Sequence, residues 1–146
     1  MSAIRTILLA EDSAADAEMA IDALRDANLA NPIVHVEDGV ETMDYLLRRG
    51  TWADRPEGLP AVLLLDIKMP RMDGLEVLRQ VRSHEQLKKM PVVILSSSRE
   101  ESDLARSWDL GVNAYVVKPV DVDQFFQAVK LLGTFWAVIN EAPAKD

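Results

Sequence analysis

An apolar stretch that ends at a single carboxylate is the first chemical feature of the sequence. Residues 61–66 read AVLLLD, and the residues that follow, IKMPRMDG, form a short segment containing proline and glycine. A buried strand that ends at Asp66 would carry this carboxylate to the edge of a sheet. Because a carboxylate can attack a phosphoryl group and carry it covalently, Asp66 is a candidate nucleophile.

Further reactive side chains stand at the ends of other apolar runs. They are two carboxylates, a hydroxyl and an ammonium, carried by Glu11, Asp12, Ser96 and Lys118. In open parallel sheets ligands bind outside the carboxyl ends of the strands, so we expect these side chains to gather around Asp66. Three carboxylates about 5 Å apart would repel by roughly 3 kcal/mol per pair at an effective dielectric of about 20. A cation must neutralise them, and oxygen ligands without histidine or cysteine favour a hard divalent ion such as Mg²⁺.

These residue types together suit phosphoryl transfer. Asp66 would attack the phosphoryl group, while the metal and Lys118 stabilise the transferring oxygens and Ser96 donates a hydrogen bond to them. Taken singly, each residue has an ordinary explanation, since Glu11 and Asp12 could simply cap the helix that follows them. The combination is what favours a phosphoryl-transfer site.

Short apolar runs that alternate with helix-patterned segments must position these side chains. Three runs without polar alternation are typical of strands buried on both faces, and two weaker runs bring the expected strands to five. The runs span 6–10, 32–36, 61–66, 91–96 and 113–118. Helical spacing is found at 17–24, 40–47, 75–81 and 104–108, and a fifth helix is expected from near Asp121 to near Ile139. Right-handed crossovers then give an α/β fold, a doubly wound open parallel sheet with helices on both faces.

Length, charge and cysteine content narrow the class of protein. A chain of 146 residues that is 49% hydrophobic suits one domain, 1–146, with a core of about 5–130, a last helix to about 139 and a tail, 140–146. The formal net charge of −8 is unfavourable for binding nucleic acid. The absence of cysteine and of a long N-terminal apolar segment predicts a cytoplasmic protein without a membrane partner.

Four motifs together resemble the receiver domain of bacterial response regulators. They are AED (10–12), LLLDIKMPRMDG (63–74), ILSS (94–97) and AYVVKP (114–119), and their order and spacing are specific. The resemblance covers residues 5 to about 130. It implies a flavodoxin-like sheet with strand order 2-1-3-4-5 and five helices. It also implies a signalling protein that catalyses only its own phosphoryl transfer and dephosphorylation, and that is not otherwise an enzyme.

The resemblance assigns a role to each residue of the expected site. Asp66 would be the phosphoacceptor, and Ser96 and Lys118 would bind the phosphoryl group. Mg²⁺, or another divalent cation, would be held by Glu11, Asp12, Asp66 and the main-chain oxygen of Lys68. Tyr115 matches the aromatic residue that turns inward as Ser96 moves toward the phosphate, so these two residues would form the switch.

Three other functions compete with this interpretation. A metal-dependent aspartyl-phosphate phosphatase usually has a second acid two residues after its nucleophile, and Lys68 stands there instead. A phosphorylation-independent interaction module would not explain why every charged site position is filled. A flavin carrier with this topology would need a phosphate-cradling loop, which the sequence lacks.

The expected partners are proteins. The chain resembles small stand-alone receivers paired with bacterial phytochrome kinases, which implies a sensor histidine kinase, with a bacteriophytochrome as the candidate, and output through protein contacts without a DNA-binding domain. The last helix is apolar over an arc of roughly 240°, more than the roughly 100° that docking on a sheet requires. We therefore expect a homodimer through the fourth and fifth helices. The expected interface residues are Phe126, Leu131, Phe135, Trp136 and Val138.

Overall fold

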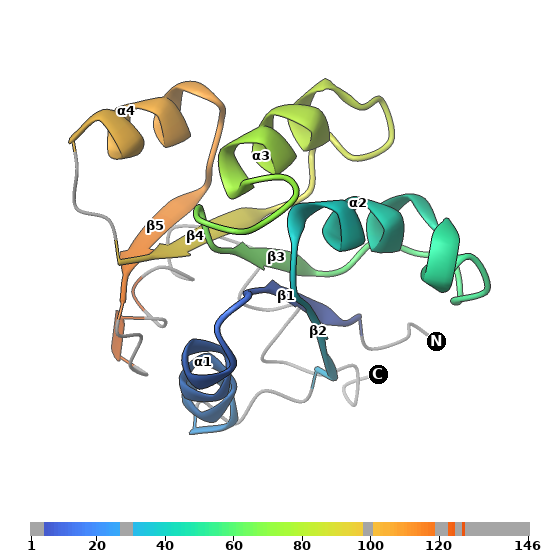
Figure 1. Ribbon diagram of the computed structural model, residues 1–146, viewed down its shortest axis with the longest axis horizontal. Helices are drawn as coiled ribbons and strands as arrows, with labels where there is room; N and C mark the ends of the chain where they lie inside the picture. The colour runs from blue at the N-terminus through green and yellow to red at the C-terminus, as the bar shows by residue number, and fades with distance from the viewer. Residues whose placement is uncertain (1–4, 27–30, 98–100, 119–122, 125–126, 128–146) are drawn as a thin grey trace, which may run out of the picture.

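The computed structural model describes residues 5–26, 31–97, 101–118, 123–124 and 127. Its centre is a parallel sheet with strand order β2-β1-β3-β4-β5 (Figure 1). The strands are β1 (Ile7–Ala10), β2 (Ile33–Val36), β3 (Val62–Leu65), β4 (Val92–Ser96) and β5 (Ala114–Val117). The predicted strands and their order are confirmed, with each boundary within about one residue of the expected position.

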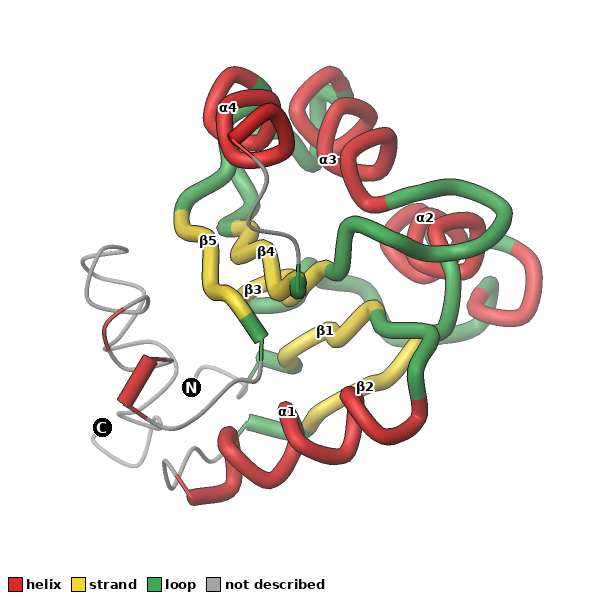
Figure 2. Tube along the Cα trace, turned by 60° about the vertical axis from the view of Figure 1, so that its left-hand side comes forward, coloured by secondary structure: helices red, strands yellow, loops and turns green. Residues whose placement is uncertain are grey.

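Helices cover both faces of the sheet, so the doubly wound fold is confirmed. Helix α1 (Ala14–Asp26) lies on one face, and α2 (Gly39–Leu47), α3 (Gly74–Ser83) and α4 (Glu101–Asp109) lie on the other (Figure 2). Of the predicted fifth helix, residues 123, 124 and 127 are helical. The rest of that prediction lies outside the described residues.

Two apolar cores flank the sheet, because successive residues of a strand point to opposite faces. In β1, Leu8 and Ala10 belong to the core that includes α2 and α3, whereas Ile7 and Leu9 belong to the core that includes α1. All four side chains are at most 1% exposed. Burial on both faces is the reason that this strand shows no polar alternation.

The long connection after α2 is organised by Arg55. This segment begins with a short 3₁₀ helix, η1 (Gly50–Trp52). The Arg55 guanidinium donates to the carbonyl oxygens of Tyr45, at 2.6 Å, and Leu46, at 3.3 Å, and it lies 4.2 Å from the centre of the Tyr45 ring. These carbonyls belong to the last turn of α2, where the Arg48 N–H already donates to the Tyr45 carbonyl at 3.3 Å. Arg55 therefore adds side-chain donors to this end of α2 from the loop that follows it.

Asp38 caps the other end of α2 and joins it to the loop between β3 and α3. Its carboxylate accepts a hydrogen bond from the Glu41 N–H at 2.7 Å and pairs with Arg71 Nε at 3.0 Å. Burial acts to raise the pKa of Asp38, but the Glu41 and Arg71 contacts outweigh it and the pKa is lowered. A carboxylate with a lowered folded pKa stabilises the fold above its unfolded pKa, and this contribution is lost as the pH falls through the folded value.

We expect Asp38→Ala to lower the free energy of unfolding by about 1 kcal/mol at neutral pH, because both the cap and the ion pair are lost. Asp38→Asn should keep most of the cap but not the charge. The stability difference between wild type and Asp38→Asn should therefore shrink as the pH falls below the ordinary value of 3.8. Urea unfolding at pH about 7 and about 3 measures this, and an unchanged difference would contradict the assigned charge.

Candidate functional site

The carboxyl ends of the strands bring the predicted acids together. The Asp66 N–H donates to the Ala10 carbonyl at 3.0 Å, and the Glu11 N–H donates to the Val36 carbonyl at 3.0 Å. The sheet pairing thus continues one residue beyond β1 and β3, and it fixes where both acids leave the sheet.

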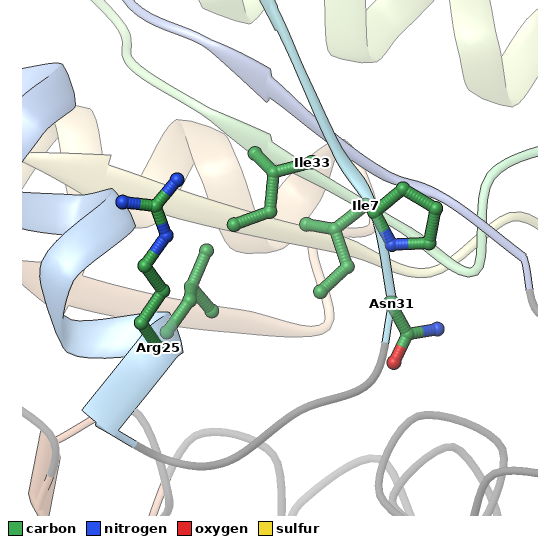
Figure 3. A pocket seen from close by; sticks show the side chains of 6 residues that line it. Ile7, Arg25, Asn31 and Ile33 are labelled. Atoms are coloured by element: carbon green, nitrogen blue, oxygen red, sulfur yellow. The ribbon is translucent and has the colours of Figure 1, made fainter.

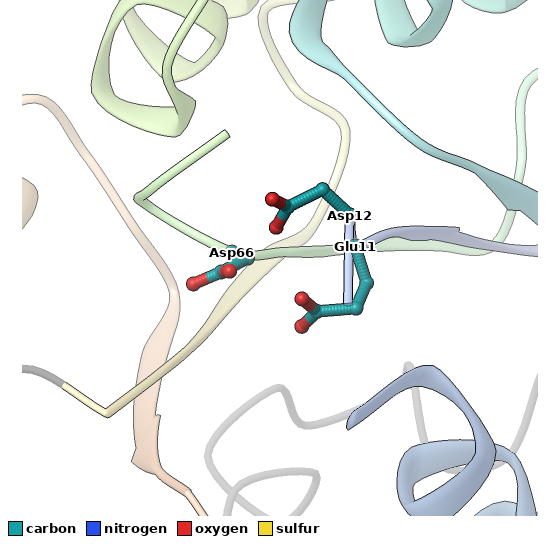
Figure 4. A group of neighbouring side chains, drawn as sticks. All are labelled: Glu11, Asp12 and Asp66. Carbon is teal, nitrogen blue, oxygen red and sulfur yellow. The ribbon is translucent and has the colours of Figure 1, made fainter. Parts of the chain in front are cut away.

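Glu11, Asp12 and Asp66 form one cluster. Each offers a carboxylate oxygen, and these oxygens all lie within 4.8 Å of one another. The three side chains come from the ends of β1 and β3 and point to the same side (Figure 4). Glu11 is 2% exposed and Asp66 is 6% exposed, whereas Asp12 is open to solvent. The cluster could hold a divalent ion, since it presents hard oxygen ligands with one side accessible from water.

Lys118 supplies the positive charge of the site. It follows β5, and its N–H donates to the Ser96 carbonyl at 2.9 Å, which fixes the backbone beside β4. Its ammonium contacts Glu11 Oε1 at 2.5 Å, Asp66 Oδ2 at 3.3 Å and Asp16 Oδ2 at 2.9 Å. The structure therefore places Lys118 with the predicted acids and adds Asp16, a residue that the sequence analysis missed. The only signal for it was an acid in the first turn of the helix after Glu11 and Asp12.

Burial dominates the electrostatics of the two inner acids. It raises the pKa of Asp66 and of Glu11, and the charge and hydrogen bond of Lys118 oppose that rise in both. Burial alone would lower the pKa of Lys118, but its contacts with Glu11, Asp16 and Asp66 outweigh burial and raise it. The contacts with the acids therefore favour the charged form of Lys118.

The loop after Asp66 is held by close backbone contacts. Gly74, the first residue of α3, donates its N–H to the Ile67 carbonyl at 2.7 Å. A Cβ atom on Gly74 would lie 2.1 Å from the Asp66 carbonyl oxygen, so the helix start packs directly on the backbone of the candidate nucleophile. A Cβ on Gly39 would likewise lie 2.0 Å from the Met72 carbonyl oxygen. Glycine is required at both positions by close approach of backbone, which the sequence analysis did not detect.

The other residues predicted for the site differ in how far they are exposed to solvent. Ser96 ends β4 and is fully buried, and Tyr115 is a half-buried residue of β5 packed against the core that includes α2 and α3. Lys68 follows Asp66 in the loop and is exposed, and its N–H donates to the Asp66 carboxylate. The movement of Ser96 and Tyr115 stays a prediction. The expected dimer-interface residues Phe126, Leu131, Phe135, Trp136 and Val138 lie outside the described residues.

A pocket of about 220 Å³ lies at the opposite end of the sheet, where β1 and β2 begin (Figure 3). Its lining includes Ile7, Ile33, Arg25 and Asn31. In the described part of the chain, Asn31 Oδ1 is a buried side-chain atom with no hydrogen-bond partner. Because the acidic cluster lies at the carboxyl ends of the strands, this pocket is separate from it.

The helices of the described segments include none that is long and apolar enough to cross a membrane. Residues 7–130 match the family model of the response regulator receiver domain.

A curated relative is similar to this chain over almost its whole length, in sequence and in structure. The response regulator Rcp1 of Synechocystis sp. is 33% identical over 96% of this chain and 94% of its own length. Its solved Mn²⁺-bound form has a TM-score of 0.75 over 90% of this chain and 94% of that one.

Two further solved structures are similar. The bacteriophytochrome response regulator RtBRR is 53% identical, with a TM-score of 0.87 over 97% of this chain and 85% of that one. The phosphorylated cyanobacterial phytochrome response regulator RcpA is 40% identical, with a TM-score of 0.76 over 92% of this chain and 94% of that one. With a parallel sheet that gathers three acids and a lysine at its carboxyl edge, this chain belongs to the response regulator receiver domain family of signalling proteins.

Proposed function

We propose that this protein is a phosphorylation-activated signalling switch in which Asp66 accepts a phosphoryl group from a sensor histidine kinase. The observation that carries the proposal is the contact of Lys118 Nζ with Asp66 Oδ2 at 3.3 Å inside a cluster of acids suited to a divalent ion. A nucleophile, a fixed cation and a metal-binding set thus lie within reach of one phosphoryl group. That combination is what covalent phosphoryl transfer to a carboxylate requires.

Asp66 would attack phosphorus with one carboxylate oxygen. The new oxygen–phosphorus bond forms as the bond from phosphorus to the donor atom breaks, and that electron pair stays with the donor. The donor is the kinase imidazole, or acetate when acetyl phosphate is used. Lys118 would balance charge on the transferring oxygens, and Ser96, at the end of the neighbouring strand, would donate a hydrogen bond to them. Later attack of water on phosphorus would release phosphate and restore the carboxylate.

Glu11, Asp12 and Asp66 fit a hard divalent cation, because they offer oxygen ligands within 4.8 Å of one another and neither sulfur nor nitrogen. We assign Mg²⁺ to these residues and to the main-chain oxygen of Lys68. When bound, the ion would supply positive charge that neutralises the carboxylates and the phosphoryl oxygens. By similarity, the solved Mn²⁺-bound form of Rcp1 supports a divalent metal. The solved phosphorylated form of RcpA supports phosphoryl transfer.

We further propose that the switch acts in a phytochrome signalling pathway. RtBRR is named a bacteriophytochrome response regulator and RcpA a phytochrome response regulator, which favours a bacteriophytochrome as the kinase. The phosphoryl group would draw in Ser96 and let Tyr115 turn inward, which alters the face formed by α4 and β5. We propose one receiver domain over residues 1–146, a homodimer through α4 and the last helix, and output through contacts with a protein target.

Removal of the metal tests the proposal. Incubation with acetyl phosphate and Mg²⁺ should add one acid-stable, base-labile phosphoryl group, which intact-mass measurement detects. A chelator should prevent the addition and leave the circular dichroism spectrum of the fold unchanged. Mg²⁺ at about 100 times its dissociation constant should also raise the free energy of unfolding by about 2.7 kcal/mol. Phosphorylation that is indifferent to the chelator would contradict the metal assignment.

A further inference from the structure

Within the described residues, the Lys118 ammonium has as many carboxylate partners as it has N–H donors. An ammonium group carries three N–H donors and no acceptor. Its Nζ contacts Glu11 Oε1 at 2.5 Å, Asp16 Oδ2 at 2.9 Å and Asp66 Oδ2 at 3.3 Å. A phosphoryl oxygen on Asp66 can therefore receive an N–H from Lys118 only if one of the present contacts is given up.

The three partners differ in what their release would cost. Glu11 is 2% exposed and accepts a hydrogen bond from the Ser13 N–H at 3.0 Å, so water cannot take the place of the Lys118 ammonium beside it. Asp66 is the residue that would carry the phosphoryl group. The Asp16 side chain is 40% exposed, so water can replace Lys118 as its partner at little cost. Of the two acids that would not carry the phosphoryl group, Asp16 is therefore the one that gives up Lys118 at the lower cost.

We propose that Asp16 is a latch on Lys118, a positioning residue that occupies one N–H of the ammonium until a phosphoryl group arrives. The proposal rests on the proposed function of Asp66. Asp16 lies in the first turn of α1, and its N–H donates to Ser13 Oγ at 3.2 Å, so its backbone is fixed beside the site. A phosphoryl group brings about −1.5 to −2 charges, more than the single charge of Asp16, and so displaces it from Lys118. Asp16 thereby weakens phosphoryl binding and keeps Lys118 committed to the resting arrangement.

Asp16→Asn tests the latch, with Glu18→Gln as the matched control. Glu18 is an exposed acid on the same helix, and its loss changes the net charge equally. Titrations with Mg²⁺ alone, and with beryllofluoride at saturating Mg²⁺, would be followed by nuclear magnetic resonance. Asp16→Asn should bind beryllofluoride, a phosphoryl stand-in, about two- to fivefold more tightly than wild type, the range expected for a partly exposed ion pair. It should bind Mg²⁺ no more tightly, because a negative charge near the cation is lost.

The conservative variant and the metal-free protein provide further readouts. Asp16→Glu should restore the wild-type affinity for beryllofluoride, and Glu18→Gln should match wild type for both probes. In metal-free Asp16→Asn, the protons of the Lys118 ammonium should exchange with water faster than in wild type.

The outcomes separate the latch from the proposed function. A wild-type protein that binds no beryllofluoride at saturating Mg²⁺ would overturn the function of Asp66 and the latch with it. Equal beryllofluoride affinity in wild type and Asp16→Asn would overturn the latch alone. Weaker binding of both probes by Asp16→Asn would also overturn the latch, because that pattern indicates damage to α1. An equal gain in beryllofluoride affinity in Glu18→Gln would overturn it too.

Discussion

Asp66→Asn should leave the protein folded and unable to take up a phosphoryl group. The amide has the size of the carboxylate but lacks its nucleophilic oxygen, so no acyl phosphate can form. Labelled phosphate from acetyl phosphate or a kinase, and intact mass, would measure a complete loss of incorporation. Full labelling of the variant would refute Asp66 as the acceptor.

The same variant carries a second expectation about stability. Burial raises the pKa of Asp66, so the folded state disfavours its ionised form when no metal is bound. For a carboxyl with a raised folded pKa, stability is lost as the pH rises from the unfolded to the folded value. At neutral pH the free energy of unfolding of metal-free Asp66→Asn should therefore be at least as large as that of wild type. Mg²⁺ should raise it by less than it raises that of wild type.

Asp73→Asn is the matched control for Asp66→Asn. Asp73 lies in the same loop and caps α3 by accepting a hydrogen bond from the Glu76 N–H at 2.9 Å. Asparagine is as good a helix cap as aspartate, so the fold should be kept. Asp73→Asn should take up phosphate like wild type, which would separate loss of the nucleophile from loss of a negative charge in this loop.

The sheet and its active edge could be predicted from sequence because both depend on local pattern. A strand buried on both faces must be apolar throughout, so β1 and β3 were visible as short runs, and Asp66 stood out as the residue that ends one of them. The parallel sheet then required the ends of these strands to meet at one edge. Motif resemblance supplied the strand order and the individual roles.

What the sequence did not reveal depends on contacts between distant segments. Asp16 and Lys118 are 102 positions apart, and nothing in the pattern of α1 indicates that one of its acids reaches β5. In the sequence Arg55 looks like an ordinary loop arginine, but in the structure its guanidinium donates to a carbonyl in the last turn of α2. The glycine that opens α3 looks like part of a turn, although its role is to let two backbones touch.

That glycine gives the second large expected effect. In a helix interior alanine is favoured over glycine by up to about 1 kcal/mol, so propensity alone would predict a small gain for Gly74→Ala. The added Cβ, however, would lie 2.1 Å from the Asp66 carbonyl oxygen and 2.9 Å from the Ile67 Cα, and both neighbours are backbone that cannot rotate away. The clash should win, and we expect a net loss of about 1 to 3 kcal/mol in the free energy of unfolding.

Relief of this clash must move the backbone of Asp66 relative to Lys118 and the other acids. A displacement of about 1 Å at a reacting group can cost about a hundredfold in rate, so Gly74→Ala should accept phosphate from acetyl phosphate ten- to a hundredfold more slowly. The comparison variant is Gly39→Ala, whose Cβ would lie 2.0 Å from the Met72 carbonyl oxygen. It should lose similar stability but retain most of the labelling rate, because its clash falls on Met72 and not on Asp66. Urea unfolding and initial labelling rates at saturating Mg²⁺ measure both effects, and equal loss of rate in the two variants would show that general loosening, not displacement of Asp66, limits the transfer.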